Sequence, residues 1–209
     1  MYLRWLDALP PVVSILPKPQ WTGFCVADAS ANGQECGIGG AVTFPSHEVF
    51  CFSYYRMHSS DFVKLNIPMH DNLQGDISSL ETLAQIALVF LVTRILPGFR
   101  IPLRISTLSD NTAAEAVSNK LFSTQMPLAL FLERLSILIS SSNVQVDVNH
   151  IAGVSNDLAD ALSRWDQQGG PPCICNRDDR FPLSLGDIRS PHQTAQLYPS
   201  DAWVPRSLP

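Results

Sequence analysis

The chain has 209 residues, of which 45% are hydrophobic, and it carries a formal net charge of −5. This length and apolar content are enough for one packed domain with extensions. The negative charge argues against a freestanding nucleic-acid binder that relies on a basic surface, but it is compatible with acidic residues gathered to hold metal.

The sequence predicts neither an export signal nor a membrane span. The N-terminal stretch contains Asp7 and the pair Pro10-Pro11 where an uninterrupted apolar run would be needed. The most hydrophobic segment, Thr82–Thr93, is shorter than the roughly 20 residues that span a bilayer. Five cysteines, an odd number at scattered positions, fit a reducing compartment better than a disulfide framework. We therefore expect a soluble intracellular protein, cytoplasmic or nuclear, with no membrane contact.

Proline positions divide the chain into three parts. We expect an irregular N-terminal arm at 1–20, one domain at 21–166 and a Pro-rich linker or disordered tail at 167–209, because the tail has no periodicity and many breakers. Cys173 and Cys175 are the start of a zinc pattern, but no second pair of ligands follows at the required spacing.

Within the domain, alternation of apolar residues predicts strands and a period of 3.6 predicts helices. In chain order we expect strands at 23–28, 36–44 and 48–57, a polar connection at 58–76, a helix at 76–96, a strand at 102–110, helices at 111–120 and 127–141, a strand at 143–148 and a helix at 156–165. This order predicts an α/β fold with a mixed five-stranded sheet, in which a three-strand meander precedes parallel strands, flanked by helices.

Three acidic residues stand at unusual places in these elements. Asp28 and Asp110 each end an apolar strand, at the edge where open α/β sheets place their sites, although a single strand-end aspartate usually forms a cap or turn. Glu81 falls inside the apolar stripe of the long helix. A carboxylate that faces the core needs a partner, a proton or a metal, and a Glu–Arg pair is the alternative to a site.

A fourth acidic residue lies in the last motif, "HIAGVSNDLADALSR". His150 precedes Asn156 by six residues and Asp160 by ten. On the last helix, Asn156, Asp160 and Ser163 share a small polar face, which suits either solvent or a charged site. Because the four carboxylates come from separate elements, they can converge at one place.

Four segments resemble the motifs of the ribonuclease H family: "DASANGQECGIGG", "SSLETLAQIAL", "LSDNTAAEAV" and "HIAGVSNDLADALSR". The likeness is strongest to ribonuclease H domains attached to reverse transcriptases of retroelements, where "DNTAA" and the last motif are familiar. It covers about residues 22–165, and the four motifs stand in the family's order.

The resemblance implies a ribonuclease H-like fold and a site for two divalent metals. In that reading Asp28, Glu81, Asp110 and Asp160 are the metal ligands, and His150 assists proton transfer or product departure. Mg²⁺, with Mn²⁺ as a substitute, suits a set of carboxylates without thiolate or imidazole ligands. Two such ions activate a water and stabilise the leaving oxygen of a phosphodiester.

The resemblance further implies hydrolysis of the RNA strand of RNA–DNA hybrids, with a polymerase domain as a partner in cis or in trans. Ser30, Asn111 and Asn156 are candidate substrate contacts. The region 111–143 balances Lys120 and Arg134 with two glutamates, so it lacks the basic substrate-binding surface of some family members.

Three alternatives compete with this reading. A DEDD-type exonuclease needs Asp-x-Glu in its first strand, where this chain has Asp28-Ala29-Ser30. An integrase or transposase core would carry glutamate on the last helix in place of Asp160. A catalytically silent ribonuclease H-like scaffold that binds nucleic acid would keep the fold without the chemistry.

Overall fold

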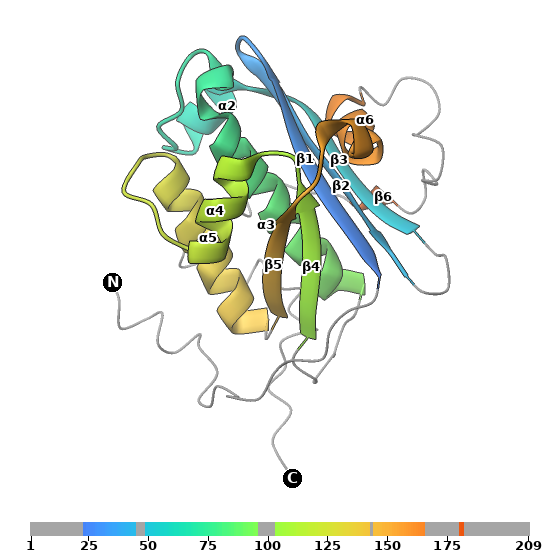
Figure 1. Cartoon of the computed structure of the whole chain (residues 1–209). Coiled ribbons are helices and arrows are strands. Elements are labelled where there is room, and N and C mark those ends of the chain that lie inside the picture. Colours follow the sequence, from blue (N-terminus) through green and yellow to red (C-terminus); the bar gives the residue numbers. More distant parts are fainter. Residues whose placement is uncertain (1–22, 45–48, 96–102, 143, 166–179, 182–209) are drawn as a thin grey trace.

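The molecule is a single sheet with helices on both faces (Figure 1). The computed structural model describes residues 23–44, 49–95, 103–142, 144–165 and 180–181. The expected arm at 1–20, all but two residues of the expected tail at 167–209, and the pair Cys173 and Cys175 therefore lie outside the described residues.

The sheet has the strand order β5-β4-β1-β2-β3-β6. The strands are β1 (Phe24–Asn32), β2 (Glu35–Thr43), β3 (Val49–His58), β4 (Leu103–Ser109), β5 (Val144–His150) and β6 (Arg180–Phe181). The first three form an antiparallel meander, whereas β4 runs parallel to β1 and β5 runs parallel to β4. The expected mixed sheet of a meander plus parallel strands is confirmed. The short β6 departs from the expected irregular tail, because it pairs in parallel with β3.

The helices follow the sequence closely. They are α2 (Ser59–Lys64), α3 (Ile77–Ile95), α4 (Thr112–Lys120), α5 (Leu128–Ser142) and α6 (Asp157–Arg164), with short 3₁₀ turns η1 (Leu73–Asp76) and η2 (Gly153–Ser155). The expected polar connection at 58–76 contains α2 and η1, because Phe62 and Leu73 are fully buried and anchor it to the core.

Helix α3 lies at the centre of the main hydrophobic core. It packs between the sheet and α5, so its residues from Leu80 to Val92 are all buried. The helix is therefore buried all round over these residues, and not only along the apolar stripe that contains Glu81. By length and composition the segment Leu73–Thr93 could cross a membrane, although the sequence alone suggested a shorter apolar run. However, 83% of its apolar window is buried inside the protein, as in the core helix of a folded domain.

Helix α6 covers the opposite face of the sheet. Ala159, Leu162 and Trp165 form a second, smaller core with strand residues Val26, Ala41 and Cys51. Two buried serine hydroxyls of the sheet bind the backbone of the helix. Ser30 Oγ donates to the Ser163 carbonyl at 2.9 Å, and Ser53 Oγ donates to the Leu162 carbonyl at 2.8 Å. The helix is thus fixed to β1, β2 and β3 at once.

The close approach of α6 depends on Gly39 in β2. A Cβ at this position would lie 2.3 Å from the Ser163 nitrogen and 2.4 Å from the Leu162 carbonyl carbon. Because both are backbone atoms, the clash can be relieved only by moving the helix or the strand. We expect Gly39→Ala to lower the free energy of unfolding by about 1–3 kcal/mol or more, measured by urea denaturation. Gly75→Ala is the control, because its nearest neighbour would be 3.9 Å away. Equal stability of the two variants would contradict this packing.

Candidate active site

The site forms where β1 and β4 part. Their parallel pairing is limited to Cys25 with Thr107 and Val26 with Leu108. Asp28 lies two residues further on, in the middle of β1 and opposite Gly39 of β2, so the expectation that it ends the strand is wrong. The sequence could not show this, because β1 is extended beyond its apolar stretch by pairing with β2. Asp110 follows the last residue of β4 directly, as expected.

Glu81 reaches the same place from the second turn of α3. Its side chain is 2% exposed, in agreement with the expected inward direction. It accepts a hydrogen bond from Ser109 Oγ at 3.4 Å and another from the backbone N–H of Ala29. One carboxylate oxygen each of Asp28, Glu81 and Asp110 lies within 4.8 Å of the others. Three of the four acidic residues selected from the sequence therefore converge.

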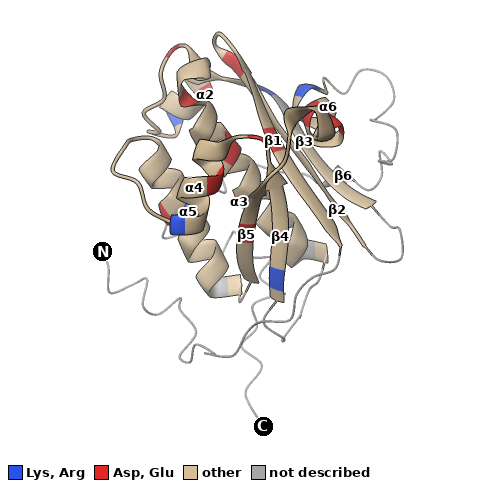
Figure 2. Cartoon of the chain, in the orientation of Figure 1, with Lys and Arg blue, Asp and Glu red and all other residues tan. Residues whose placement is uncertain are grey.

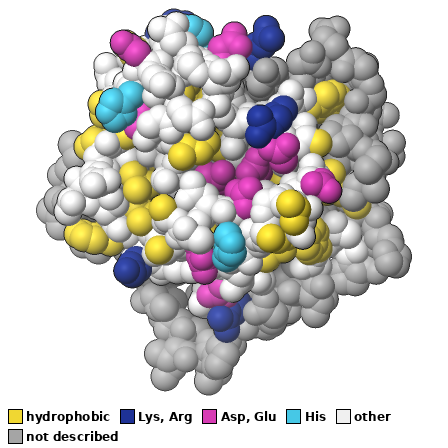
Figure 3. All heavy atoms as spheres, turned by 45° about the horizontal axis from the view of Figure 1, so that its top comes forward, with side chains coloured by type: hydrophobic (Ala, Val, Ile, Leu, Met, Phe, Trp, Pro, Cys, Tyr) yellow, Lys and Arg dark blue, Asp and Glu magenta, His cyan; other side chains and the backbone are white. Residues whose placement is uncertain are grey.

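Asp160 lies in the same groove but outside this group of three. Its Oδ1 accepts from Arg164, at 2.8 Å from Nε and 2.6 Å from Nη2. The groove has a volume of about 530 Å³ and is lined by Asp28, Ala29, Ala31, Gln74, Ile77, Glu81, Asp110, Asn111, Thr112, Asp160 and Arg164. Figure 3 shows acidic side chains gathered on this face, with a basic side chain directly beside them.

Helix α6 holds the Asp28 carboxylate with two further side chains. Ser163 Oγ donates to Oδ2 at 3.0 Å, and Asn156 Nδ2 lies 3.4 Å from Oδ1. Asn156 is 2% exposed, so it orients Asp28 from within the protein. Ser163 was not among the candidate site residues. Its place on the small polar face of the last helix was the signal that could have identified it.

The other two candidate substrate contacts have structural partners. Ser30 is buried, and its hydroxyl is used to dock α6, because it lies on the same face of β1 as Asp28. Asn111 is half-buried on the groove wall, where its Oδ1 caps α4 by accepting from the Ala114 N–H at 3.0 Å.

His150 is the last residue of β5 and lies beside the site. It is paired with Ser109, the residue before Asp110, and its side chain is exposed. The chain then turns over Asp110: a Cβ at Gly153 would come within 3.2 Å of Asp110 Oδ2. The backbone thus brings His150 next to the strand end that carries Asp110, although His150 is not among the residues that line the groove.

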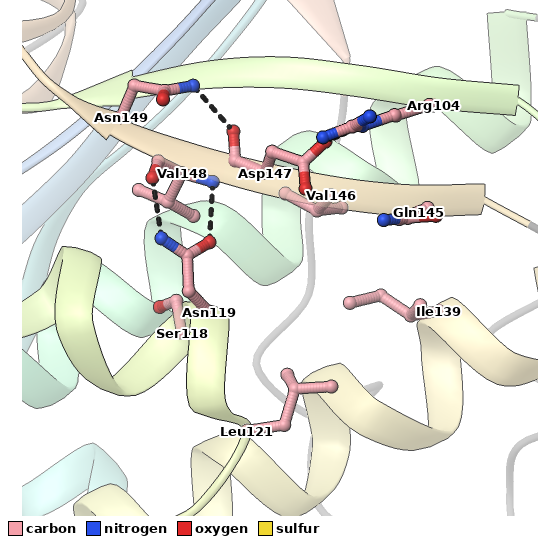
Figure 4. Close-up of a pocket in the computed structure, with 10 residues that line it drawn as sticks. All are labelled: Arg104, Ser118, Asn119, Leu121, Ile139, Gln145, Val146, Asp147, Val148 and Asn149. Carbon is pink, nitrogen blue, oxygen red and sulfur yellow. Dashed lines mark hydrogen bonds and ion pairs between the residues drawn. The ribbon is translucent and has the colours of Figure 1, made fainter. Parts of the chain in front are cut away.

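Asn119 of α4 supports the strand that carries His150 (Figure 4). Its side-chain amide donates to the Val148 carbonyl at 2.7 Å and accepts from the Val148 N–H at 2.9 Å. These bonds imitate a neighbouring strand at the edge of the sheet. The adjoining pocket, of about 370 Å³, is lined by residues of β4, β5, α4 and α5 and is separate from the acidic groove.

Burial and mutual repulsion raise the pKa values of two of the acids. Burial, followed by the charges of Asp28 and Asp110, raises the pKa of Glu81 to about 9. Burial, followed by the charge of Asp110, raises the pKa of Asp28 to about 6. Buried carboxylates in such proximity favour a proton or a cation. Since all the donor atoms are hard oxygens, the group fits a hard divalent cation.

These shifts predict how stability depends on pH without metal. The folded state binds more protons than the unfolded state between pH 4.5 and about 9 at Glu81, so its stabilising contribution is lost as the pH rises through this window. We expect the Tm of the wild type in a chelator to fall from pH 5 to pH 9, and the Tm of Glu81→Gln to fall distinctly less. Glu115→Gln, on the half-buried face of α4, is the control and should follow the wild type. If Tm falls with pH equally in Glu81→Gln and the wild type, then Glu81 is not the group whose raised pKa makes stability depend on pH.

The antiparallel meander followed by parallel strands is the mixed sheet that the sequence motifs imply. The chain has a ribonuclease H-like fold. No protein-family profile matches the chain, and no curated protein matches it.

Solved structures with similar folds include two ribonucleases H1 and a viral enzyme. RNase H1 from the halophilic archaeon Halobacterium salinarum NRC-1 is 15% identical with a TM-score of 0.47, over 68% of this chain and 93% of that chain. LC11-RNase H1 in complex with an RNA/DNA hybrid is 12% identical with a TM-score of 0.47, over 68% of this chain and 94% of that one. The prototype foamy virus protease-reverse transcriptase is 16% identical with a TM-score of 0.44, over 72% of this chain but 21% of that one. At these identities and TM-scores the likeness says nothing of the activity of this chain.

Proposed function

We propose that this chain is a metal-dependent endonuclease that hydrolyses the RNA strand of RNA–DNA hybrids, as the ribonuclease H part of a retroelement reverse transcriptase. The observation that carries the proposal is the convergence of Asp28, Glu81 and Asp110 within 4.8 Å from three separate elements. A structural role does not account for it, since two of these carboxylates are buried at a cost in charge repulsion. The free thiols of Cys25 and Cys36 support an intracellular site of action.

In this proposal the acidic residues hold two divalent cations, Mg²⁺ or its substitute Mn²⁺. Asp28, Glu81 and Asp110 would be ligands of these cations, and Asp160 would join them from α6. When bound, the cations supply an activated water and a stabilised leaving oxygen. Asn156 and Ser163 orient the Asp28 carboxylate, and the exposed imidazole of His150 moves a proton at the edge of the site. The amide of Asn111 meets the substrate at the groove wall.

The deciding experiment is cleavage of labelled RNA–DNA, RNA–RNA and DNA–DNA duplexes by the full chain with Mg²⁺, with Mn²⁺ or with a chelator. We expect cuts within the RNA strand of the hybrid alone, and only with metal. If no duplex is cut and calorimetry detects no metal binding, the chain is a silent scaffold and the proposal is wrong.

The charge distribution predicts weak substrate binding by the chain alone. Between Trp21 and Asp166 there are eight basic and fourteen acidic residues, and Lys and Arg positions are sparse along the described elements (Figure 2). Arg134, one of the two basic residues in the region 111–143, is 2% exposed and so cannot meet a phosphate. Duplex affinity depends on phosphate neutralisation, so we expect weak hybrid binding with a shallow salt dependence in fluorescence anisotropy.

A basic partner should compensate for this deficit. Fusion to a nucleic-acid-binding domain, such as the polymerase domain proposed as the neighbour, is expected to lower KM with little change in kcat, because it raises the effective substrate concentration. Tight and steeply salt-dependent binding by the isolated chain would contradict both expectations.

A further inference from the structure

The ion pair between Arg164 and Asp160 stands inside the candidate active site. Both residues belong to α6, one helical turn apart, and both line the acidic groove. Arg164 is the one basic residue among the described residues that line it. Its guanidinium uses Nε and Nη2 on a single oxygen, Oδ1 of Asp160. The acidic groove therefore contains its own cation.

This cation acts on more than its direct partner. The charge of Arg164 stabilises ionised Asp28, while the charge of Asp160 opposes it. At the same time, Asp160 does not belong to the group of three carboxylates that lie within 4.8 Å of one another. Asp160 is thus paired with Arg164 in this structure. The proposed site for two metal ions needs the Asp160 carboxylate to join Asp28, Glu81 and Asp110.

The ion pair between Arg164 and Asp160 is weak enough for both residues to change partners. The side chains of Arg164 and Asp160 are 62% and 47% exposed, so water screens their attraction. Exposed pairs of this kind are weak, and breaking one changes an affinity only about two- to fivefold. Carboxylate oxygens are preferred ligands of Mg²⁺ and Mn²⁺, whereas the planar fork of an arginine matches the oxygens of a phosphate. Each member of the pair therefore has a better partner in a metal- and substrate-bound site.

We propose that Arg164 is the counter-cation of the metal-free groove, which holds Asp160 until divalent cations bind and then contacts a backbone phosphate of the nucleic-acid substrate. This inference rests on the proposed metal-dependent function. It assigns to Arg164 a binding role at the edge of the site, where its charge first competes with the metal and then helps to hold the anionic strand.

The first test measures Mn²⁺ binding to the full chain by calorimetry, without substrate. We expect Arg164→Gln to bind Mn²⁺ about two- to fivefold more tightly than the wild type. Arg56→Gln is the matched control: it removes the same charge from an exposed arginine that pairs with Glu35 outside the groove, and it should leave the affinity unchanged. If the wild type binds no Mn²⁺, the proposed function fails; if Arg164→Gln and the wild type bind equally, only the present inference fails.

A double-mutant cycle separates the ion pair from a general field effect. If Arg164 acts by holding Asp160, then Arg164→Gln should give no further gain in Mn²⁺ affinity in an Asp160→Asn background. A gain of the same size in both backgrounds would overturn the proposed competition.

The second test addresses the phosphate contact. A cleavage-resistant hybrid with 2′-O-methyl groups on its RNA strand is titrated at saturating Mn²⁺ by fluorescence anisotropy. We expect Arg164→Gln to weaken binding about three- to tenfold and to reduce the slope of log affinity against log salt by about one, the loss of a single phosphate contact. An unchanged slope would exclude Arg164 as a phosphate ligand.

Discussion

Replacing Asp110 with asparagine is expected to abolish metal-dependent cleavage of RNA–DNA hybrids, by at least about a thousandfold. Asp110 is the exposed member of the group that also contains Asp28 and Glu81, and it stands where β4 ends. The amide keeps the shape of the side chain but removes the charge that would hold the cations. Since it also removes one of three repelling carboxylates, the Tm of the metal-free variant should equal or exceed that of the wild type.

Cleavage rates and Mn²⁺ calorimetry on the same preparations check this expectation. Asp147→Asn is the matched control, because Asp147 lies on the adjacent strand β5 and pairs with Arg104 outside the groove. It should retain both activity and metal binding. Turnover by Asp110→Asn at the wild-type rate would remove Asp110 from the site.

The second large effect is expected at His150. His150→Ala should slow turnover by roughly 10- to 10⁴-fold, the range for loss of an acid–base assistant. The affinity for Mn²⁺ should remain nearly unchanged, because the cluster of Asp28, Glu81 and Asp110 does not include the imidazole. Single-turnover cleavage and calorimetry give the two readouts.

Asn149→Ala provides the comparison for this variant, since Asn149 is the preceding exposed residue of β5 and bonds to Ser106 on β4. Loss of metal binding together with activity in His150→Ala would make His150 a ligand, and the division of roles would be wrong. Equal slowing in Asn149→Ala would point to distortion of β5 instead.

The sequence was sufficient for the elements because local pattern determines them. Every expected strand and helix in the described residues is present, with bounds that differ by a few residues at most. The position of Asp28 within its strand was harder to predict, because the end of a strand depends on the strands that pair with it. Pairing with β2 extends β1 to Asn32, whereas pairing with β4 ends after Val26. Whether a residue closes a strand is thus a property of pairing, which composition does not contain.

A site residue could be predicted from the sequence where its side chain is unusual for its place in a strand or helix. Glu81 stood out because a carboxylate in an apolar helix needs a reason. Ser30 and Arg134 had no such signal. Ser30 lies on the same face of β1 as Asp28, and only the docking of α6 shows that its hydroxyl is already used. Arg134 is of a type that is mostly exposed, and packing around α5 alone determines its burial.

The amide of Asn119 has a consequence for how the molecule meets other chains. Strand β5 lies at the edge of the sheet, and an open edge is a template on which a foreign strand can pair. Asn119 occupies both main-chain groups of Val148, two residues before His150. A strand added along this edge would be stopped short of the imidazole. The same side chain that steadies β5 therefore also leaves no main-chain group of Val148 open to a foreign strand.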